Sequence, residues 1–234
     1  MCYLESMVED SLEAINSKWL SQPVLGKTRY AKGLAISALL PVVFVMYGWI
    51  FNIELLKSFL PNQAPMRFIT AVAFFLSGLS VFFIAESVRG KREIAQIVLP
   101  ATSISVLLLM ATAIAGNLLN VETGIEKLFV GVLSQTAGAG EMPSVFEIVV
   151  FILISLFSIL TLFRVRYLKF IVFYLGLIMA GFGLISASGR ITGIGFLNLD
   201  SLPVFFSSLI LVILGGAFVV LGRIINSLEI YPYD

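Results

Sequence analysis

Six side chains with amide or carboxylate oxygens stand near the ends of the apolar segments of this chain: Asn117, Asn120, Glu122, Glu141, Glu147 and Asp200. All of them are expected on the same, outer side of the predicted helices. If they converge, they form a small acidic mouth that suits a cation or an amine, because such oxygens accept hydrogen bonds and coordinate hard cations. If they do not converge, they are the solvated ends of loops. The sequence favours solvated loop ends and leaves the cation or amine site open.

Glu147 is the acid of this set that falls inside an expected apolar helix, in the stretch GEMPSVFEIVVFILISLF. Pro143 suits the first turn of a helix, which puts Glu147 only about 6 Å into it. The positive end of the helix dipole favours a carboxylate at that depth. We therefore favour a place at the membrane surface for Glu147. Binding of a ligand or proton, and contact with a partner subunit, stay open as alternatives.

The motifs of known catalytic and cofactor sites do not occur in this sequence. It has no Ser/His/Asp set, Walker loop, HExxH or CxxC, and it has no histidine at all. The lack of histidine counts against ligation of haem or chlorophyll. The single cysteine, Cys2, allows neither an internal disulfide nor a thiolate cluster. A net charge of +1 gives no reason to expect nucleic acid as a partner. We expect no enzyme activity and no cofactor.

The elements that must position these residues are apolar helices. Hydrophobic residues make up 59% of the 234 residues and charged residues only 12%, against roughly a half and a quarter in a soluble domain. The bilayer must therefore be the solvent for most of the chain. Six segments are long and apolar enough to span it, at about residues 33–53, 68–85, 94–118, 144–163, 168–187 and 202–222.

The distribution of positive charge predicts the orientation of these helices. Of the 15 lysines and arginines, all but Lys57, Arg67, Lys127 and Arg190 fall on the side that holds both termini. Cytoplasmic loops carry the excess of positive charge, so both termini are expected in the cytoplasm and the protein in the cell membrane. On the outer side, residues 55–60 and 125–133 are apolar enough to form short helices or re-entrant turns at the interface.

Three regions follow from this organisation. Residues 1–30 are expected to form a cytoplasmic amphipathic helix and linker, 31–223 the transmembrane domain, and 224–234 a short cytoplasmic tail. The amphipathic helix is indicated by apolar residues at three- and four-residue steps, which are Leu4, Met7, Val8, Leu12, Ile15 and Trp19.

The expected helices pair into three similar hairpins, whose connections begin at GWIFNIELLK, AGNLLNVETG and ASGRITGIGF. Each hairpin has a small residue near the end of its first helix, a polar connection with glycine or proline, and a phenylalanine-rich second helix. Internal repeats of this kind are the first feature to seek in a sequence. The predicted fold is thus an all-α integral membrane protein with six transmembrane helices in three repeated hairpins.

The second helix of the first hairpin carries APMRFITAVAFFLSG, which contains the pattern M-x-x-x-T-A-x-A-F-x-x-x-G. The matching residues are Met66, Thr70, Ala71, Ala73, Phe74 and Gly78. This stretch resembles the multi-pass N-terminal sensor regions of prokaryotic histidine kinases and diguanylate cyclases. In the second hairpin Met142 fits the pattern, but Phe146 and Glu147 replace the threonine and the alanine. The third hairpin keeps almost only the hydrophobicity.

In that family the membrane region feeds a cytoplasmic output domain, and none is visible here. The resemblance therefore implies a sensory or regulatory module that acts through separate membrane or cytoplasmic proteins. An accessory structural subunit of a larger membrane complex is the alternative, and a small transporter or channel is a third hypothesis. Besides lipid, we expect a protein partner.

Small residues at helical spacing are expected to let helices approach closely, as small-xxx-small patterns do in membranes. They are Ala111, Ala115, Gly176, Ala180, Gly181, Gly183, Gly189 and Gly193.

Overall fold

Helices make up almost all of the chain that the computed structural model describes, residues 22–58, 65–88, 92–119, 144–161, 168–192 and 205–229. No β-strand occurs within these ranges, so the all-helical prediction is confirmed there. The helices are α2 (Gln22–Ile50), α3 (Glu54–Ser58), α4 (Phe68–Val88), α5 (Arg92–Leu119), α7 (Val145–Leu160), α8 (Leu168–Thr192) and α9 (Phe205–Glu229).

Five of these helices are long and apolar enough to cross a membrane. The candidate spans are Thr28–Ile50, Phe68–Val88, Glu93–Gly116, Lys169–Gly189 and Phe205–Asn226. They indicate a multi-pass membrane protein. The remaining apolar helix, α7, has 16 residues and is about 24 Å long at 1.5 Å per residue, shorter than the hydrocarbon core of about 30 Å. A sixth span therefore stays a prediction.

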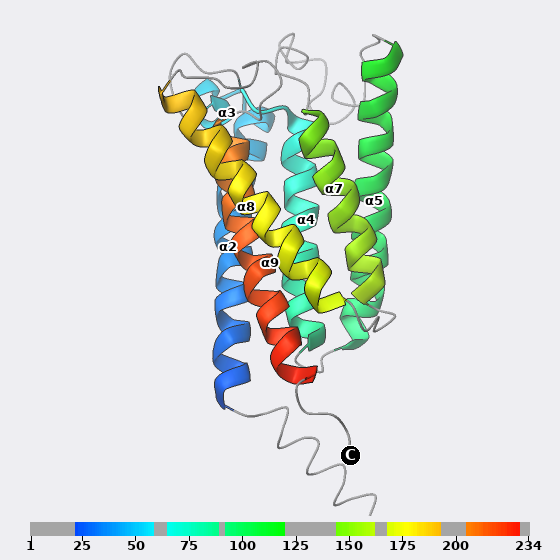
Figure 1. Cartoon of the computed structure of the whole chain (residues 1–234). Helices are drawn as coiled ribbons and strands as arrows, with labels where there is room; N and C mark the ends of the chain where they lie inside the picture. Colours follow the sequence, from blue (N-terminus) through cyan, green and yellow to red (C-terminus); the bar gives the residue numbers. More distant parts are fainter. Residues whose placement is uncertain are drawn as a thin grey trace, which may run out of the picture.

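The long helices alternate in direction along one bundle (Figure 1). α2, α5 and α8 run toward the end of the bundle that carries α3, and α4, α7 and α9 run away from it. We call these the α3 end and the opposite end. The three expected pairs, α2 with α4, α5 with α7 and α8 with α9, pack against each other. However, α4 also packs on α5, and α2 on α9, so the pairs do not stand apart as separate units.

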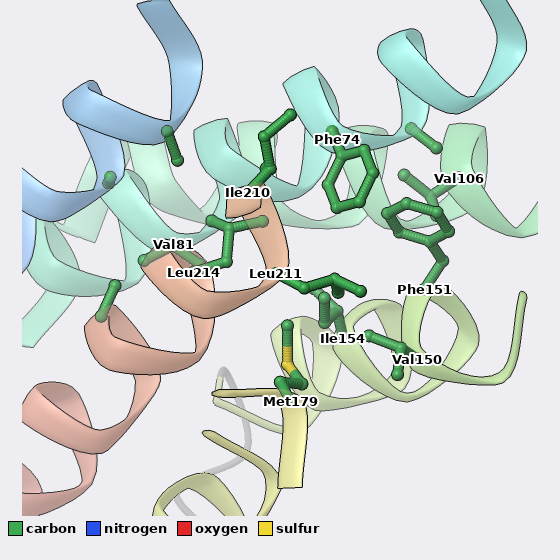
Figure 2. Packing of buried hydrophobic residues seen from close by; sticks show 14 of the residues in the cluster. Phe74, Val81, Val106, Val150, Phe151, Ile154, Met179, Ile210, Leu211 and Leu214 are labelled. Atoms are coloured by element: carbon green, nitrogen blue, oxygen red, sulfur yellow. The ribbon is translucent and has the colours of Figure 1, made fainter. Parts of the chain in front are cut away.

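α4 lies at the centre of the bundle, in contact with α2, α5, α7 and α9. Figure 2 shows its core contacts, where Phe74 of α4 meets Phe151 of α7 and Val106 of α5 lies beside the second ring. The two ring centroids are 4.7 Å apart in an edge-to-face arrangement. Lipid is as apolar as these side chains, so close packing, rather than removal from water, holds such helices together.

α8 and α9 form the closest pair, and glycines allow their backbones to touch. A Cβ atom at Gly176 would lie 2.6 Å from the backbone nitrogen of Val219 and 2.7 Å from the carbonyl oxygen of Gly215. A Cβ atom at Gly215 would lie 2.5 Å from the nitrogen of Ala180. Gly183 meets the carbonyl oxygen of Ser208 in the same way, at 2.7 Å. No side chain larger than hydrogen fits at these positions without separating the helices.

The other small residues singled out from the sequence lie elsewhere. Gly181 has nothing within 4 Å of an added Cβ atom, because it is turned about 100° from Ala180 around the helix axis. Ala111 and Ala115 are exposed, since α5 packs on α4 and α7 with its other face. Gly189 is partly exposed. Gly193 lies outside the described residues.

The helices run past the expected domain boundaries. α2 begins at Gln22, before residue 31, and α9 continues to Glu229, beyond residue 223. Hydropathy marks the edge of the membrane but not the end of a helix, and Pro23 is tolerated in α2 because it stands in the first turn. The predicted amphipathic segment up to residue 21 and the last five residues of the tail lie outside the described ranges.

Candidate functional site

A tight corner joins α2 to α3 and begins the candidate site. Asn52 has a φ of 55°, the left-handed conformation that commonly ends a helix and that asparagine tolerates. The amide of Ile53 donates to the carbonyl oxygen of Gly48 at 2.8 Å, which satisfies one of the last carbonyls of α2. A Cβ atom at Gly48 would lie 2.6 Å from Cβ of Leu56. Glycine at this position therefore lets α3 fold back onto α2.

Trp49 and Lys57 meet inside this corner. The indole Nε1 of Trp49 donates to the carbonyl oxygen of Met66 at 2.8 Å, which ties the end of α2 to the residue two positions before α4. The Lys57 ammonium lies 4.6 Å from the centroid of the Trp49 ring and donates to Oδ1 of Asn52 at 2.5 Å. Lys57 is only 5% exposed. We call Trp49, Asn52, Glu54, Lys57 and Met66 the corner site.

The charge of Lys57 is held in a poorly solvated place. Burial lowers the pKa of Lys57 below its usual range, and the Glu54 carboxylate opposes this change. A cation on the face of an indole ring gains about 0.5–2 kcal/mol, more when it is desolvated. In the corner site, burial thus disfavours the charged form of Lys57, while Glu54 and the Trp49 ring favour it.

A second polar contact joins α2 directly to α4, at the opposite end of the bundle from the corner site. Lys32 forms an ion pair with Glu86, and both side chains are about six-sevenths buried. The Lys32 ammonium also lies 5.3 Å from the centroid of the Phe82 ring. Both residues belong to candidate membrane spans, where charged side chains are rare and are paired when they occur.

Glu147 lies at the start of α7, at the α3 end of the bundle, and is 3% exposed. It forms a capping box with Ser144. The Ser144 hydroxyl accepts from the amide of Glu147 at 3.2 Å, and the Glu147 carboxylate accepts from the amide of Ser144 at 2.8 Å. α7 therefore begins at Val145, so that Pro143 precedes the helix instead of standing in its first turn, and Glu147 is the third helical residue. Its carboxylate accepts from the amide of the N-cap residue, near the positive end of the helix dipole.

Glu147 is the one member of the expected six-residue polar cluster whose side chain is described. Asn117 belongs to the last turn of α5, at the same end of the bundle as Glu147. Asn120, Glu122, Glu141 and Asp200 lie outside the described residues. Convergence of the cluster on a cation or an amine therefore stays a prediction. Across the described ranges, no group of three or more His, Cys, Asp or Glu side chains could hold a metal ion.

The residues of the expected repeat motif lie in the core of the bundle. Those of the first hairpin are all buried: Met66, Thr70, Ala71, Ala73, Phe74 and Gly78. Gly78 faces Leu39 of α2, and its added Cβ atom would lie 2.9 Å from a Leu39 methyl group. These residues thus pack α4 against its neighbours, and Met66 also accepts the Trp49 hydrogen bond. Met142 of the second hairpin lies outside the described residues.

Neither the corner site nor the Lys32–Glu86 ion pair was anticipated from the sequence. Lys32 and Glu86 each stand one residue outside the expected spans 33–53 and 68–85, and charges this close to a span are candidates for a functional hypothesis. Tryptophan and lysine close together at the end of a span also indicate an interfacial anchor. What the sequence could not supply was the partner of each residue.

The described part of the chain is thus helical, its five long apolar helices indicate a multi-pass membrane protein, and α2 carries buried polar contacts at both of its ends, to α3 and Met66 at one and to α4 at the other. Neither a family model, nor a curated protein, nor a solved structure matches this chain.

Proposed function

We propose that this protein is a membrane-embedded sensory or regulatory module that acts through a partner protein. The observation that carries the proposal is the placement of two buried polar contacts at opposite ends of one helix pair. The corner site links α2 to Met66, just before α4, and the Lys32–Glu86 pair links α2 to α4 at the other end. A change at one end can alter the contact at the other by shifting α2 along α4, as packed helices do in many switches.

The orientation in the membrane is part of this proposal. The positive-inside rule puts the Lys32–Glu86 end in the cytoplasm and the corner site outside. α7 then completes six spans, with local thinning of the bilayer or tilting of its neighbours to match its short length. The resemblance of the Met66–Gly78 motif to kinase and cyclase sensor regions supports the same direction of signalling, from the outer side to a cytoplasmic partner.

Purification in mild detergent from the native membrane tests the proposal. We expect a particle whose mass and composition include a second protein with a cytoplasmic output domain. Lys57→Met is expected to change the activity of that protein while leaving the amount of folded chain unchanged. Glu93→Gln, at an exposed residue of α5, is the matched control and is expected to change neither. A chain that purifies alone, or a partner indifferent to Lys57→Met, contradicts the proposal.

A structural accessory subunit is the second candidate, favoured by the outward face of α5. Ala101, Ala111 and Ala115 are exposed on that face, and such small residues let another membrane helix approach closely. In this case the chain is expected in a fixed, stoichiometric complex. Ala111→Leu is then expected to release it from the complex, whereas Lys57→Met is expected to leave the complex and its activity unchanged.

A further inference from the structure

Buried hydroxyl groups gather near the middle of the bundle where α4, α5 and α7 meet. Ser80 of α4 and Thr102 of α5 share a hydrogen bond of 2.8 Å between the two helices. A carbonyl oxygen one turn earlier in the same helix is also within hydrogen-bond distance of each hydroxyl. Because a hydroxyl has a single proton, one of the two donates to its carbonyl while the other donates across to its partner. Ser80 and Thr102 are thus satisfied, and they fix the relative positions of α4 and α5 along the bundle axis.

Two neighbouring hydroxyls are buried without such partners. Ser77 is 0% exposed and Ser103 is 1% exposed. Within the described part of the chain, neither Oγ atom has a hydrogen-bond partner. Other serines of these helices donate to a backbone carbonyl one turn earlier, as Ser155 does to Phe151 at 2.9 Å. A buried hydroxyl without a partner is costly, so Ser77 and Ser103 call for a partner outside the protein chain.

The helix register brings Ser77 and Ser155 to the same level. α4 and α7 run in the same direction (Figure 1), and the rings of Phe74 and Phe151 are in contact. Ser77 follows Phe74 by three residues, and Ser155 follows Phe151 by four. Residues three and four apart share a helix face, so the two serines lie about one turn beyond the paired rings, on the sides of α4 and α7 that face each other.

Ser103 reaches the same place from α5. In Figure 2, Val106 of α5 lies beside the Phe151 ring. α5 runs opposite to α7, so Ser103, three residues before Val106, lies one turn beyond Phe151. At 1.5 Å per residue it is about 1.5 Å along the axis from Thr102, and Ser77 is about 4.5 Å from Ser80. The three serines are therefore at similar heights on three helices that pack against one another.

We propose that Ser77, Ser103 and Ser155 line a hydration site between α4, α5 and α7 that holds one ordered water molecule. Buried waters typically make about three hydrogen bonds to otherwise unsatisfied polar groups. Ser77 and Ser103 each offer a donor and an acceptor, and Ser155 offers its acceptor lone pairs while it donates to Phe151. The site carries no charge in its described side chains, which suits water better than an ion. This inference does not depend on the proposed function.

A high-resolution experimental structure of the full chain tests the site directly. We expect density for one water within about 3.2 Å of the three Oγ atoms. Density that is absent, with the Ser77 and Ser103 hydroxyls bonded instead to each other or to backbone carbonyls, overturns the proposal.

Alanine variants give a second, independent test through thermal unfolding in detergent. Ser77→Ala and Ser103→Ala are each expected to lower the unfolding temperature by about 2–4 °C. The double variant is expected to lower it by scarcely more than either single variant, because both changes remove the same bound water. Ser105→Ala is the control, since Ser105 is exposed on α5 and donates to Ala101 at 2.8 Å; it is expected to have little effect.

The opposite results are equally clear. If the two hydroxyls are truly unsatisfied, their removal leaves the unfolding temperature unchanged or raises it. If they act in separate places, their effects add. Either result overturns the proposal of a shared water.

Discussion

Replacing Gly215 by alanine tests whether backbone contact holds α8 against α9. The new Cβ atom would lie 2.5 Å from the nitrogen of Ala180 and 2.7 Å from the carbonyl oxygen of Gly176. Non-bonded heavy atoms prefer about 3.5–4.0 Å, so the helices must separate by about 1 Å. Both atoms belong to the backbone of α8, and no side-chain rotation can relieve the clash.

The expected loss of stability can be set against a neighbouring control. Overpacking of this kind costs about 1–3 kcal/mol. Alanine is also a better helix former than glycine, by about 1 kcal/mol in water, which partly offsets the clash. Gly216→Ala carries the same gain without the clash, because nothing lies within 4 Å of a Cβ atom there. The two variants should therefore differ in free energy of unfolding by about 1–3 kcal/mol.

The assay is reversible unfolding in mixed micelles of a mild detergent and dodecyl sulfate, followed by circular dichroism. Gly181→Ala serves as a second control, on α8, where an added Cβ atom also meets open space. Gly215→Ala is expected to unfold at a lower fraction of dodecyl sulfate than either control. Equal stability of Gly215→Ala and Gly216→Ala would refute the backbone contact.

Three further predictions concern the polar groups. Burial lowers the pKa of Lys57, so the folded chain releases this proton at lower pH than the unfolded chain. The test is the free energy of unfolding of the wild type and of Lys57→Met, measured across a pH series. Between the lowered pKa and about 10.4, the free energy of unfolding of the wild type should rise with pH relative to that of the variant. Parallel profiles of the two proteins would exclude a lowered pKa. A double-mutant cycle of Ser80→Ala and Thr102→Val in the same unfolding assay should give a coupling free energy of about 0.6 kcal/mol, typical of hydrogen bonds between membrane helices. If the two changes in free energy of unfolding simply add, the Ser80–Thr102 bond contributes nothing to stability. Ser144→Ala should cost about 1 kcal/mol of stability, because the N-cap is lost. Glu147→Gln should cost only about 0.3–1 kcal/mol, because glutamine keeps an acceptor oxygen and loses only the charge near the helix dipole. A larger loss for Glu147→Gln would indicate that the carboxylate charge has another role.

Much of the helical organisation follows from the sequence alone. Long apolar runs can satisfy their backbone groups in lipid only as helices or closed barrels, which is why the expected segments 68–85 and 94–118 correspond to α4 and α5. The start of α7 was also within reach of the sequence. A serine three residues before a glutamate, ahead of an apolar run, is the signature of a capping box, and it indicates Val145 as the first helical residue more directly than Pro143 does.

Which residues meet across the bundle was decided by the tertiary structure. Helical periodicity assigns a face to each residue but does not say which helix covers that face. For this reason the packing of Gly176 against Gly215 could be anticipated only as a general role for small residues, and Gly181, one position from Ala180, turned out to face open space. The pairing of Trp49 with Lys57 likewise depends on the left-handed Asn52, which folds α3 back onto α2, because a local backbone turn sets contacts that composition and periodicity do not specify.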